Sequence, residues 1–343
     1  MITVRAVRED DLDAVHALAE RAAPGMTTLP PDRQALCRKI HASCASVARE
    51  IGTPGPEYYF LVMEDSDRQR VVGTAAIIAC LGEDEPFYSY KLNRVTHKSR
   101  VLDKRVSVRL LYLSNHFEGF AEVATLFLAP EYRHSGNGAL LARSRYLFMR
   151  RFRERFPEYV MADLRGHYDE QGRSPFWEAV GRHFFDMEFH EADVFGALNG
   201  NQFITELMPT QPVYVNLLPE PAQAVIGRVN KAGEPAMALL EREGFRWRDH
   251  VDIFDGAPSV DCAIDELASV AGAVELPLAA IGEAAQARRC LLAAGSPADF
   301  LACAALAEIG DEGVQLRPET AAALRVAPGE RLTVIALGDT PAA

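Results

Sequence analysis

Residues 125–149, TLFLAPEYRHSGNGALLARSRYLFM, constrain the fold most, because an apolar run, a proline and a helical pattern follow one another there. The pattern predicts a buried strand that ends before Pro130 and a helix that begins around two glycines, Gly136 and Gly138. A simple reversal of the chain needs only one glycine, so two glycines indicate a backbone that something approaches closely. Since helix N-termini attract anions, the segment predicts an anion-binding turn. The helix that follows has one well-defined apolar face, made of Leu140, Leu141, Ser144, Leu147, Phe148 and Phe152.

The turn itself reads Arg133-His134-Ser135-Gly136-Asn137-Gly138. Successive backbone N–H groups in such a loop form a concave anion site, and an arginine at its mouth adds charge-assisted hydrogen bonds to phosphate oxygens. The pattern lacks the GK[ST] of a Walker A loop and is not a Rossmann fingerprint. A plain turn with a convenient helix cap is the alternative interpretation.

The charge balance excludes several classes of partner. The 343 residues carry a formal net charge of −12, which disfavours a general binder of nucleic acid or of anionic membranes. The six cysteines form no CxxC pair and no metal-like cluster with histidine, so we expect reduced thiols and no metal. No signal peptide precedes Ile2 and no apolar run approaches the ~18 residues that span a bilayer, so we expect a cytoplasmic protein.

The order of patterns along residues 1–194 is strand, helix, helix, hairpin, strand, helix, strand, helix, strand. This order predicts an α/β (α+β) fold with one mixed sheet flanked by helices. Residues 203–207 and 213–217 are predicted as strands, and residues 235–245 as a helix that ends at Gly244. The segments 175–184 and 238–247 share a helix-to-strand pattern, which indicates duplication into two lobes. We therefore predict a first lobe at 1–195, a second and shorter half-unit at 196–256, and a small β-rich C-terminal module at 257–343.

The loop, the N-terminal VRAVREDDLDAV segment and the FLVMEDSDRQRVVGTAAI hairpin resemble the GNAT acyl-CoA-dependent N-acyltransferases. A sharper resemblance, to the arginine N-succinyltransferase family, runs through essentially the whole chain. It is carried by TTLP (27–30), PFYSY (86–90), DEQGRSPFWEAVGRHFF (169–185), ITELMP (204–209), VIGRV (225–229), EGFRW (243–247) and VDIFDGAP (251–258).

The resemblance implies transfer of a succinyl group from succinyl-CoA to the α-amine of L-arginine, or of ornithine, in arginine catabolism. Succinyl-CoA would be a co-substrate, and no cofactor would be bound permanently. Some members of the family work as paired non-identical chains, so a homo-oligomer or a hetero-oligomer with a related chain is expected. The alternative is an acyl-CoA-binding subunit of such a pair that is inactive or weakly active alone.

The resemblance also implies site residues. It marks Leu126 for contact with succinyl-CoA, on a strand whose backbone, with Phe127 and Leu128, polarises the thioester carbonyl. The diphosphate of the coenzyme would lie on Arg133, Gly136, Asn137 and Gly138. Glu122 and Glu206 are candidate bases, although each also fits an ordinary surface carboxylate. Arg165 can hold a carboxylate of a substrate or form an ordinary salt bridge.

Two departures from the family pattern concern the chemistry. The family's proton-donor histidine, followed by proline, is replaced by Asn230-Lys231, and an asparagine amide cannot release a proton near neutral pH. The segment NHFEG (115–119) stands where the family usually has an Asn-Asp-x-Thr-Gly-like run. A coenzyme A thiolate is a good leaving group, however, because its thiol pKa is near that of free cysteine, about 8.5. We therefore expect an enzyme, with Asn230 of doubtful catalytic role.

Overall fold

A computed structural model describes the chain except for residues 23–25, 27, 201, 284–285 and 338–343. Thr27 of the TTLP motif and the last six residues thus lie outside the described residues. The chain divides into two compact units. Unit 1 comprises Met1–Ala79, Ala121–Glu158 and Ala263–Ala343, and unit 2 comprises Cys80–Phe120 and Tyr159–Cys262. The domain boundaries that the sequence predicts at residues 195 and 256 stay a prediction.

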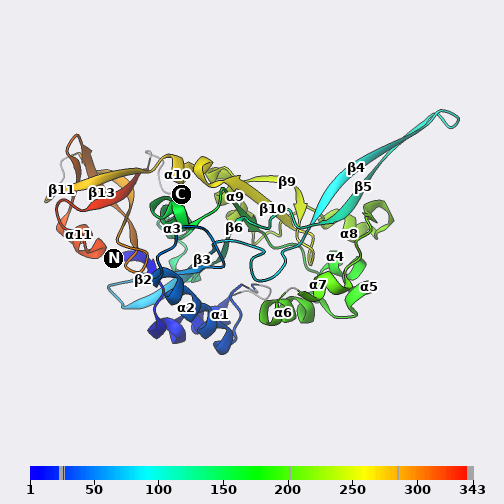
Figure 1. Cartoon of the computed structure of the whole chain (residues 1–343), viewed down its shortest axis with the longest axis horizontal. Coiled ribbons are helices and arrows are strands. Elements are labelled where there is room, and N and C mark those ends of the chain that lie inside the picture. The colour runs from blue at the N-terminus through cyan, green and yellow to red at the C-terminus, as the bar shows by residue number, and fades with distance from the viewer. Residues whose placement is uncertain (23–25, 27, 201, 284–285, 338–343) are drawn as a thin grey trace. The chain divides into compact units, whose positions relative to one another are not determined.

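Unit 1 begins with four antiparallel strands in the spatial order β1-β2-β3-β6. Helices α1 and α2 connect β1 to β2, and α3 follows β6, with α1 and α2 on one side of these strands and α3 on the other (Figure 1). The bounds are β1 Ile2–Ala6, α1 Leu12–Arg21, α2 Arg33–Ala48, β2 Tyr58–Asp65, β3 Arg70–Ile78, β6 Ala121–Leu128, α3 Asn137–Arg151 and α10 Ala268–Ala271. The predicted N-terminal strand and helix, the second helix, the hairpin and the strand-to-helix segment are all confirmed.

The C-terminal part of unit 1 is a closed five-stranded barrel. Its strands pair in the ring β11-β14-β13-β12-β15 and back to β11, with β11 and β14 parallel and the other pairs antiparallel. Closure leaves no free sheet edge within the ring. The interior is apolar, with Leu292, Val314 and Leu332 fully buried. The bounds are β11 Val274–Ile281, β12 Arg288–Ala294, β13 Leu301–Gly310, β14 Gly313–Leu316, α11 Pro318–Leu324 and β15 Arg331–Ala336.

Helix α3 is attached to both parts of unit 1. It contacts β1, β3 and β6 on the sheet and β12, β13 and β15 on the barrel. Phe148 is fully buried, and its ring lies 4.9 Å from that of Tyr59 on β2 and 5.1 Å from that of Phe300 next to β13. At the last turn, Arg151 Nε donates to the carbonyl of Gly295, 2.7 Å away. The predicted apolar face is therefore buried, and the barrel covers more of the helix than an amphipathic pattern predicts.

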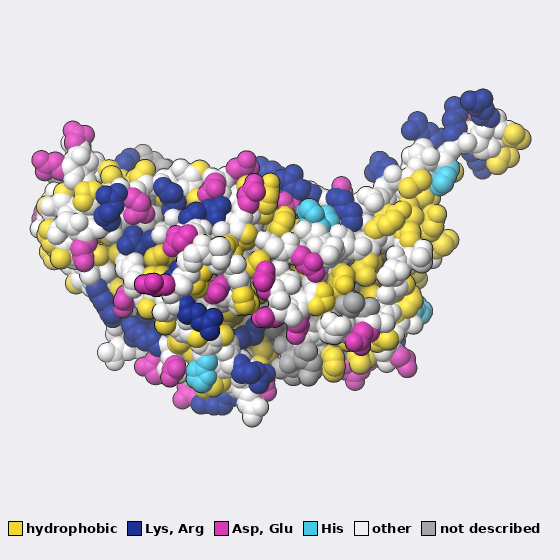
Figure 2. Space-filling view, viewed as in Figure 1, with side chains coloured by type: hydrophobic (Ala, Val, Ile, Leu, Met, Phe, Trp, Pro, Cys, Tyr) yellow, Lys and Arg dark blue, Asp and Glu magenta, His cyan; other side chains and the backbone are white. Residues whose placement is uncertain are grey.

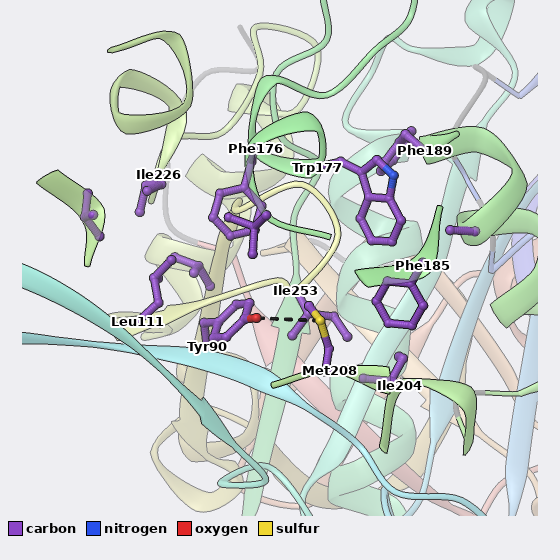
Figure 3. Packing of buried hydrophobic residues seen from close by; sticks show 14 of the residues in the cluster. Tyr90, Leu111, Phe176, Trp177, Phe185, Phe189, Ile204, Met208, Ile226 and Ile253 are labelled. Carbon is purple, nitrogen blue, oxygen red and sulfur yellow. Dashed lines mark hydrogen bonds between the residues drawn. The ribbon is translucent and has the colours of Figure 1, made fainter. Parts of the chain in front are cut away.

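Unit 2 is built on the strand order β7-β10-β9-β4-β5-β8 with helices packed around an aromatic core. Figure 3 shows this core, in which Trp177, Phe176 and Tyr90 are buried and the Tyr90 hydroxyl lies 3.8 Å from the sulfur of Met208. The bounds are β4 Ser89–Ser99, β5 Lys104–Ser114, β7 Tyr159–Asp163, α4 Pro175–Ala179, α5 Arg182–Phe185, α6 Phe189–Asn199, α7 Gln202–Leu207, β8 Val213–Tyr214, α8 Glu220–Val225, α9 Glu234–Glu243, β9 Arg246–Val251 and β10 Pro258–Ala263.

Two predicted strands of unit 2 are wrong. Residues 203–207 lie in α7, because Ile204 and Met208, four residues apart, both face the core, which is a helical period. The strand predicted to follow the helix of the 175–184 segment is replaced by α5 and α6, which are separated by a left-handed turn at Asp186 (φ +52°). The helix-to-strand pattern is therefore seen at 234–251, where Gly244 (φ +112°) caps α9 as predicted, but not at 175–185. The repeat that indicated two lobes is thus not seen in these segments.

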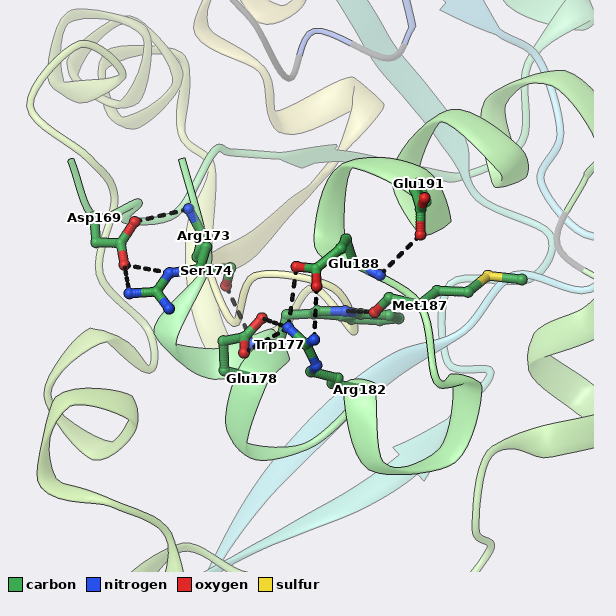
Figure 4. A network of polar contacts seen from close by, with 9 residues as sticks. All are labelled: Asp169, Arg173, Ser174, Trp177, Glu178, Arg182, Met187, Glu188 and Glu191. Atoms are coloured by element: carbon green, nitrogen blue, oxygen red, sulfur yellow. Dashed lines mark hydrogen bonds and ion pairs between the residues drawn. The ribbon is translucent and has the colours of Figure 1, made fainter. Parts of the chain in front are cut away.

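Polar contacts hold the helices α4 to α6 together around Trp177. Its indole Nε1 donates to the carbonyl of Met187, 3.0 Å away, while Arg182 bridges Glu178 and Glu188 (Figure 4). These ion pairs are partly exposed, so each contributes little to stability. The burial of the indole side chain stabilises this region more than the ion pairs do.

In the described part of the chain, no helix combines the length and the apolar character needed to cross a lipid bilayer.

Gly181 tests this packing, because a Cβ added there would lie 2.3 Å from the Trp177 ring. We expect Gly181→Ala to lower the free energy of unfolding by about 1–3 kcal/mol, the usual range for overpacking. Gly52→Ala is the matched control, since nothing lies within 4 Å of the added Cβ. Urea unfolding of both variants checks this, and equal midpoints would contradict the packing described for the indole.

Candidate functional site

A β-bulge interrupts β6 at the residue that the sequence marks for coenzyme contact. Ala76 pairs with Ala124 and Thr74 pairs with Phe127, so β6 has one residue more than β3 between these pairs. Thr125 adopts a left-handed conformation (φ +57°), and its carbonyl accepts a hydrogen bond from Thr74 Oγ1 at 3.0 Å. Bulges disrupt the ladder of hydrogen bonds locally and re-aim the backbone. Leu126, which has no partner in the β3 register, lies at this point.

Two side chains, those of Asp65 and Asn137, support the turn after β6 through hydrogen bonds to Tyr132. The hydroxyl of Tyr132 donates to Asp65 Oδ2 at 2.9 Å, and Asn137 Nδ2 donates to the Tyr132 carbonyl at 3.1 Å. Ser135 (φ +54°) and Gly136 (φ +81°) are both left-handed, and Gly136 is the N-cap of α3. The side chain of Asn137 therefore supports the turn from its buried side, and its assignment to the coenzyme site stays a prediction.

Four backbone N–H groups of this turn have no acceptor among the described residues: those of Ser135, Gly136, Gly138 and Ala139. A Cβ added at Gly138 would meet nothing within 4 Å, so the space before the helix is open. Arg133 stands at the edge of the turn, where its Nε donates to the Leu128 carbonyl at 2.9 Å and its guanidinium lies 5.8 Å from the Phe127 ring centre. Phe127 and Leu128 have buried side chains, and they contribute a ring face and a carbonyl to the support of Arg133.

Glu122, the candidate base on β6, is buried and lies opposite Ile78 in the β3 register. The charge of Glu122 acts on the pKa of Lys39, which lies on α2. Burial lowers the pKa of Lys39, while Glu122 partly offsets this effect. Sequence reasoning missed Lys39, because nothing in a helical pattern distinguishes a partly buried lysine from an exposed one.

In unit 2, Asn230 holds a turn with its side chain. Its Nδ2 donates to the Gly166 carbonyl at 2.9 Å, its Oδ1 accepts from the Gly233 N–H at 2.8 Å, and its own N–H donates to the Arg165 carbonyl at 2.9 Å. The structure therefore brings Asn230 and the Arg165 backbone together. Both ends of the amide are engaged with backbone, which describes a structural role for this position.

Three carboxylates that the sequence did not single out surround the Arg165 segment. Asp255 is fully buried and satisfied, since its Oδ2 accepts from the Gly166 N–H and the Tyr168 hydroxyl and its Oδ1 accepts from the Ala257 N–H. Asp163 and Asp252 are partly exposed, and each has one oxygen bonded, to the hydroxyl of Ser259 for Asp163 and to backbone N–H groups for Asp252.

These carboxylates repel one another. Burial raises the pKa of Asp163 to about 6; Asp255 adds to the increase, and the hydrogen bond from Ser259 and the charge of Arg165 oppose it. Burial likewise raises the pKa of Asp252 well above its ordinary value, followed by the charges of Asp255 and Asp163. Like charges that share a buried region are costly, and Arg165 offsets only part of that cost, which makes the cluster a candidate site for a cationic ligand. The chain pattern carries no signal for it, because the three aspartates come from two distant segments.

Glu206, the second candidate base, lies on α7 with an exposed side chain. The structure does not connect it by hydrogen bond or ion pair to Asn230 or Arg165 within the described residues.

The NHFEG segment places a histidine against another histidine. The ring of His116 stacks on that of His250 at 4.6 Å, and His250 Nδ1 lies 3.2 Å from Ser89 Oγ. Burial lowers the pKa of His250 to about 4, and the charges of Lys91 and His116 contribute. His250 is therefore neutral near pH 7 and cannot serve there as a proton donor in its cationic form.

Comparison with known proteins covers the whole length of the chain. The family described as arginine N-succinyltransferase beta subunit matches residues 2–269, and its C-terminal domain matches residues 274–336. The arginine N-succinyltransferase of Yersinia pseudotuberculosis is 39% identical over 344 residues, which cover 98% of each chain. That of Citrobacter koseri is 42% identical over 270 residues, which cover 79% of this chain and 78% of the relative.

The structural comparison agrees with the sequence comparison. The arginine/ornithine succinyltransferase subunit AI from Pseudomonas aeruginosa superimposes with a TM-score of 0.88 at 36% identity, covering 99% of both chains. The predicted α/β fold, a mixed sheet with helices and a small β-rich C-terminal module, is confirmed. By the family match along its length and by its identity to these relatives, the chain is a member of the arginine N-succinyltransferase family.

Proposed function

We propose that this protein transfers the succinyl group of succinyl-CoA to the α-amine of L-arginine. The observation that carries the proposal is the turn between β6 and α3, where four backbone donors and Arg133 surround open space in a chain of this family. Ornithine is the second candidate acceptor, because the Pseudomonas aeruginosa relative is described as an arginine/ornithine succinyltransferase. The family match does not favour the alternative of a non-catalytic subunit.

The coenzyme diphosphate would accept hydrogen bonds from the Gly136, Gly138 and Ala139 amides, with Arg133 at the rim. The positive end of the α3 dipole favours the same charge. The thioester would then extend along β6 toward the bulge, where a backbone N–H at Leu126 is suited to polarise its carbonyl.

Aminolysis requires an amine without its proton, and Glu122 beside Lys39 is the proposed acceptor of that proton in unit 1. We assign no proton transfer to Asn230, since its amide is engaged with backbone. The thiolate leaves without help from that position, which its low basicity permits.

Asp163 and Asp252 are proposed to bind the cationic side chain of the acceptor. Guanidinium and ammonium groups both pair well with carboxylates, and such a ligand removes the repulsion between the two aspartates. Arg165 neutralises part of this charge in the free protein and can turn to a substrate carboxylate.

Gly138→Glu tests the coenzyme site. The substitution places a carboxylate in the open space where the diphosphate would lie, and we expect the Kd of succinyl-CoA to rise at least about tenfold. Gly138→Ala is the matched control, because the added Cβ meets no atom and Gly138 has no left-handed backbone. Gly136 is less suitable, since its φ of +81° would add strain to any substitution. Calorimetric titration measures both constants, and equal affinities would refute the assignment.

Asp163→Asn tests the acceptor site, because the substitution should stabilise the fold and weaken the binding of arginine. The raised pKa means that ionised Asp163 destabilises the fold as pH rises from about 4 to about 6, at most by about 3 kcal/mol. Above pH 6 the variant should therefore unfold at a higher temperature than the parent, with a difference that shrinks as the pH falls toward 4. Its KM for arginine should rise at least about tenfold.

Asp255→Asn provides the opposite control, since an amide NH₂ would face donors that the carboxylate now accepts. That variant should unfold at a lower temperature. If Asp163→Asn behaved in the same way, or if it left KM unchanged, the acceptor assignment would be wrong.

A further inference from the structure

Strands β4 and β5 extend into a two-stranded arm, residues 93–109, that pairs only with itself. The two strands are in register from Ser89↔Ser114 to Ser99↔Lys104, whereas β9 pairs β4 only at Tyr90 and Lys91 and β8 pairs β5 only at Leu110 and Leu111. An isolated two-stranded ribbon is marginally stable in water, so an arm of this length gains from a partner. Figure 1 shows the arm running out beyond the other strands of unit 2.

The tip of the arm is apolar and exposed. Val101 is 95% exposed, Leu102 is 69% exposed and Val106 is 49% exposed. Figure 2 shows hydrophobic side chains at the tip beside a dense group of lysines and arginines. A small apolar patch ringed by charge is typical of a surface that docks onto another molecule.

The charge of the arm indicates which kind of molecule the arm binds. The arm contains six Lys or Arg residues and one Asp, a net charge of +5, which leaves −17 on the rest of the chain, since the whole chain carries −12. A basic arm on an acidic body is complementary to a second copy of the same chain, and a two-fold arrangement would satisfy both arms at once. We propose that the arm of each chain docks onto the acidic body of a second copy and forms a homodimer.

Sedimentation of the full-length protein tests this. We expect a dimer at low ionic strength whose dissociation constant rises at least about tenfold in high salt, because complementary charges are screened. The double variant Val101→Ser/Leu102→Ser and the charge variant Arg100→Glu/Arg105→Glu should each give monomers. Neither should alter thermal unfolding of the monomer, since these side chains are exposed.

Leu217→Ser is the control, because Leu217 is also an exposed leucine of unit 2 (83% exposed) but lies outside the arm. It should leave the dimer intact. A monomeric parent at low salt, or a dimer that persists in both arm variants, would overturn the proposal.

A separate observation concerns Arg289 of the C-terminal barrel. Its Nη2 donates to the Ser135 carbonyl at 2.8 Å and would lie 3.3 Å from a Cβ at Gly136. The Arg289 side chain is exposed, and it has no carboxylate partner among the described residues. A cation without a counter-ion therefore stands beside four backbone donors without acceptors.

This inference rests on the proposed coenzyme site. We infer that Arg289 contacts a phosphate group of the coenzyme, so that the barrel forms one wall of the binding turn. The remaining N–H groups of its guanidinium supply charge-assisted hydrogen bonds to phosphate oxygens. The contact with Ser135 fixes the guanidinium at the N-terminus of α3.

Arg289→Gln should raise the Kd of coenzyme A about tenfold. Arg288→Gln is the matched control, because the neighbouring side chain on a strand points to the opposite face. Repeating the titration with 3′-dephospho-coenzyme A distinguishes the two phosphate sources: the effect disappears if Arg289 meets the 3′-phosphate and persists if it meets the diphosphate.

Turnover of S-succinyl-N-acetylcysteamine, a thioester without phosphate, separates recognition from loop support. Its kcat/KM should be unchanged in Arg289→Gln, and an equal loss there would mean that Arg289 only supports the loop. If the parent binds coenzyme A and Arg289→Gln binds it equally well, this inference alone fails. If the parent binds no coenzyme A, the proposed function fails.

Discussion

The burial of α3 is the constraint on which the coenzyme turn depends. The sheet covers one side of this helix and the barrel covers another, so its position is set along most of its length. Phe148 packs against rings from both neighbours, and Arg151 joins the last turn to the barrel. Since a helix is stiff, fixing its body also fixes the direction of its first turn. The N–H groups of Gly138 and Ala139 are thereby aimed without any contact of their own.

Two residues with a strained backbone lie at the ends of this arrangement. Thr125 and Ser135 are non-glycine residues with positive φ, a conformation that costs on the order of 1 kcal/mol or more. Specific hydrogen bonds hold each in place: Thr74 binds the Thr125 carbonyl, and Arg289 binds the Ser135 carbonyl. Strained residues supported in this way are common where a backbone must present groups to a ligand. Here the two residues flank the strand end and turn that the proposed coenzyme would follow.

In unit 2, the carboxylates near Arg165 differ in how well hydrogen bonds compensate their charge. Asp255 is buried yet fully hydrogen-bonded, and it organises the loop that carries Gly166 and Tyr168. Asp163 and Asp252 have fewer hydrogen bonds, and burial together with the charge of Asp255 raises the pKa of both. Asn230 braces the same loop through the Gly166 carbonyl. A side-chain amide can donate and accept at the same time, which gives a physical reason for asparagine at this position.

The sequence alone determined the elements with long, regular patterns. The strand-to-helix turn at 125–149, the hairpin and the glycine cap at Gly244 were predictable because local periodicity and backbone freedom decide them. Short apolar runs were not, and residues 203–207 became a helix because the core placed Ile204 and Met208 on one face.

The residues of the candidate site also fall into those that the sequence identifies and those that it does not. The loop from Arg133 to Gly138 could be recognised from local residue types, whereas Lys39, Arg289 and the three aspartates could not, because each lies far along the chain from the groups it meets. The sequence drew attention to Asn230 because its amide cannot release a proton. Only its hydrogen bonds in the folded chain indicate that it supports a turn. Local chain chemistry thus determined where an anion can bind. Long-range packing decided which charges surround that place, because burial and proximity exist only in the folded chain.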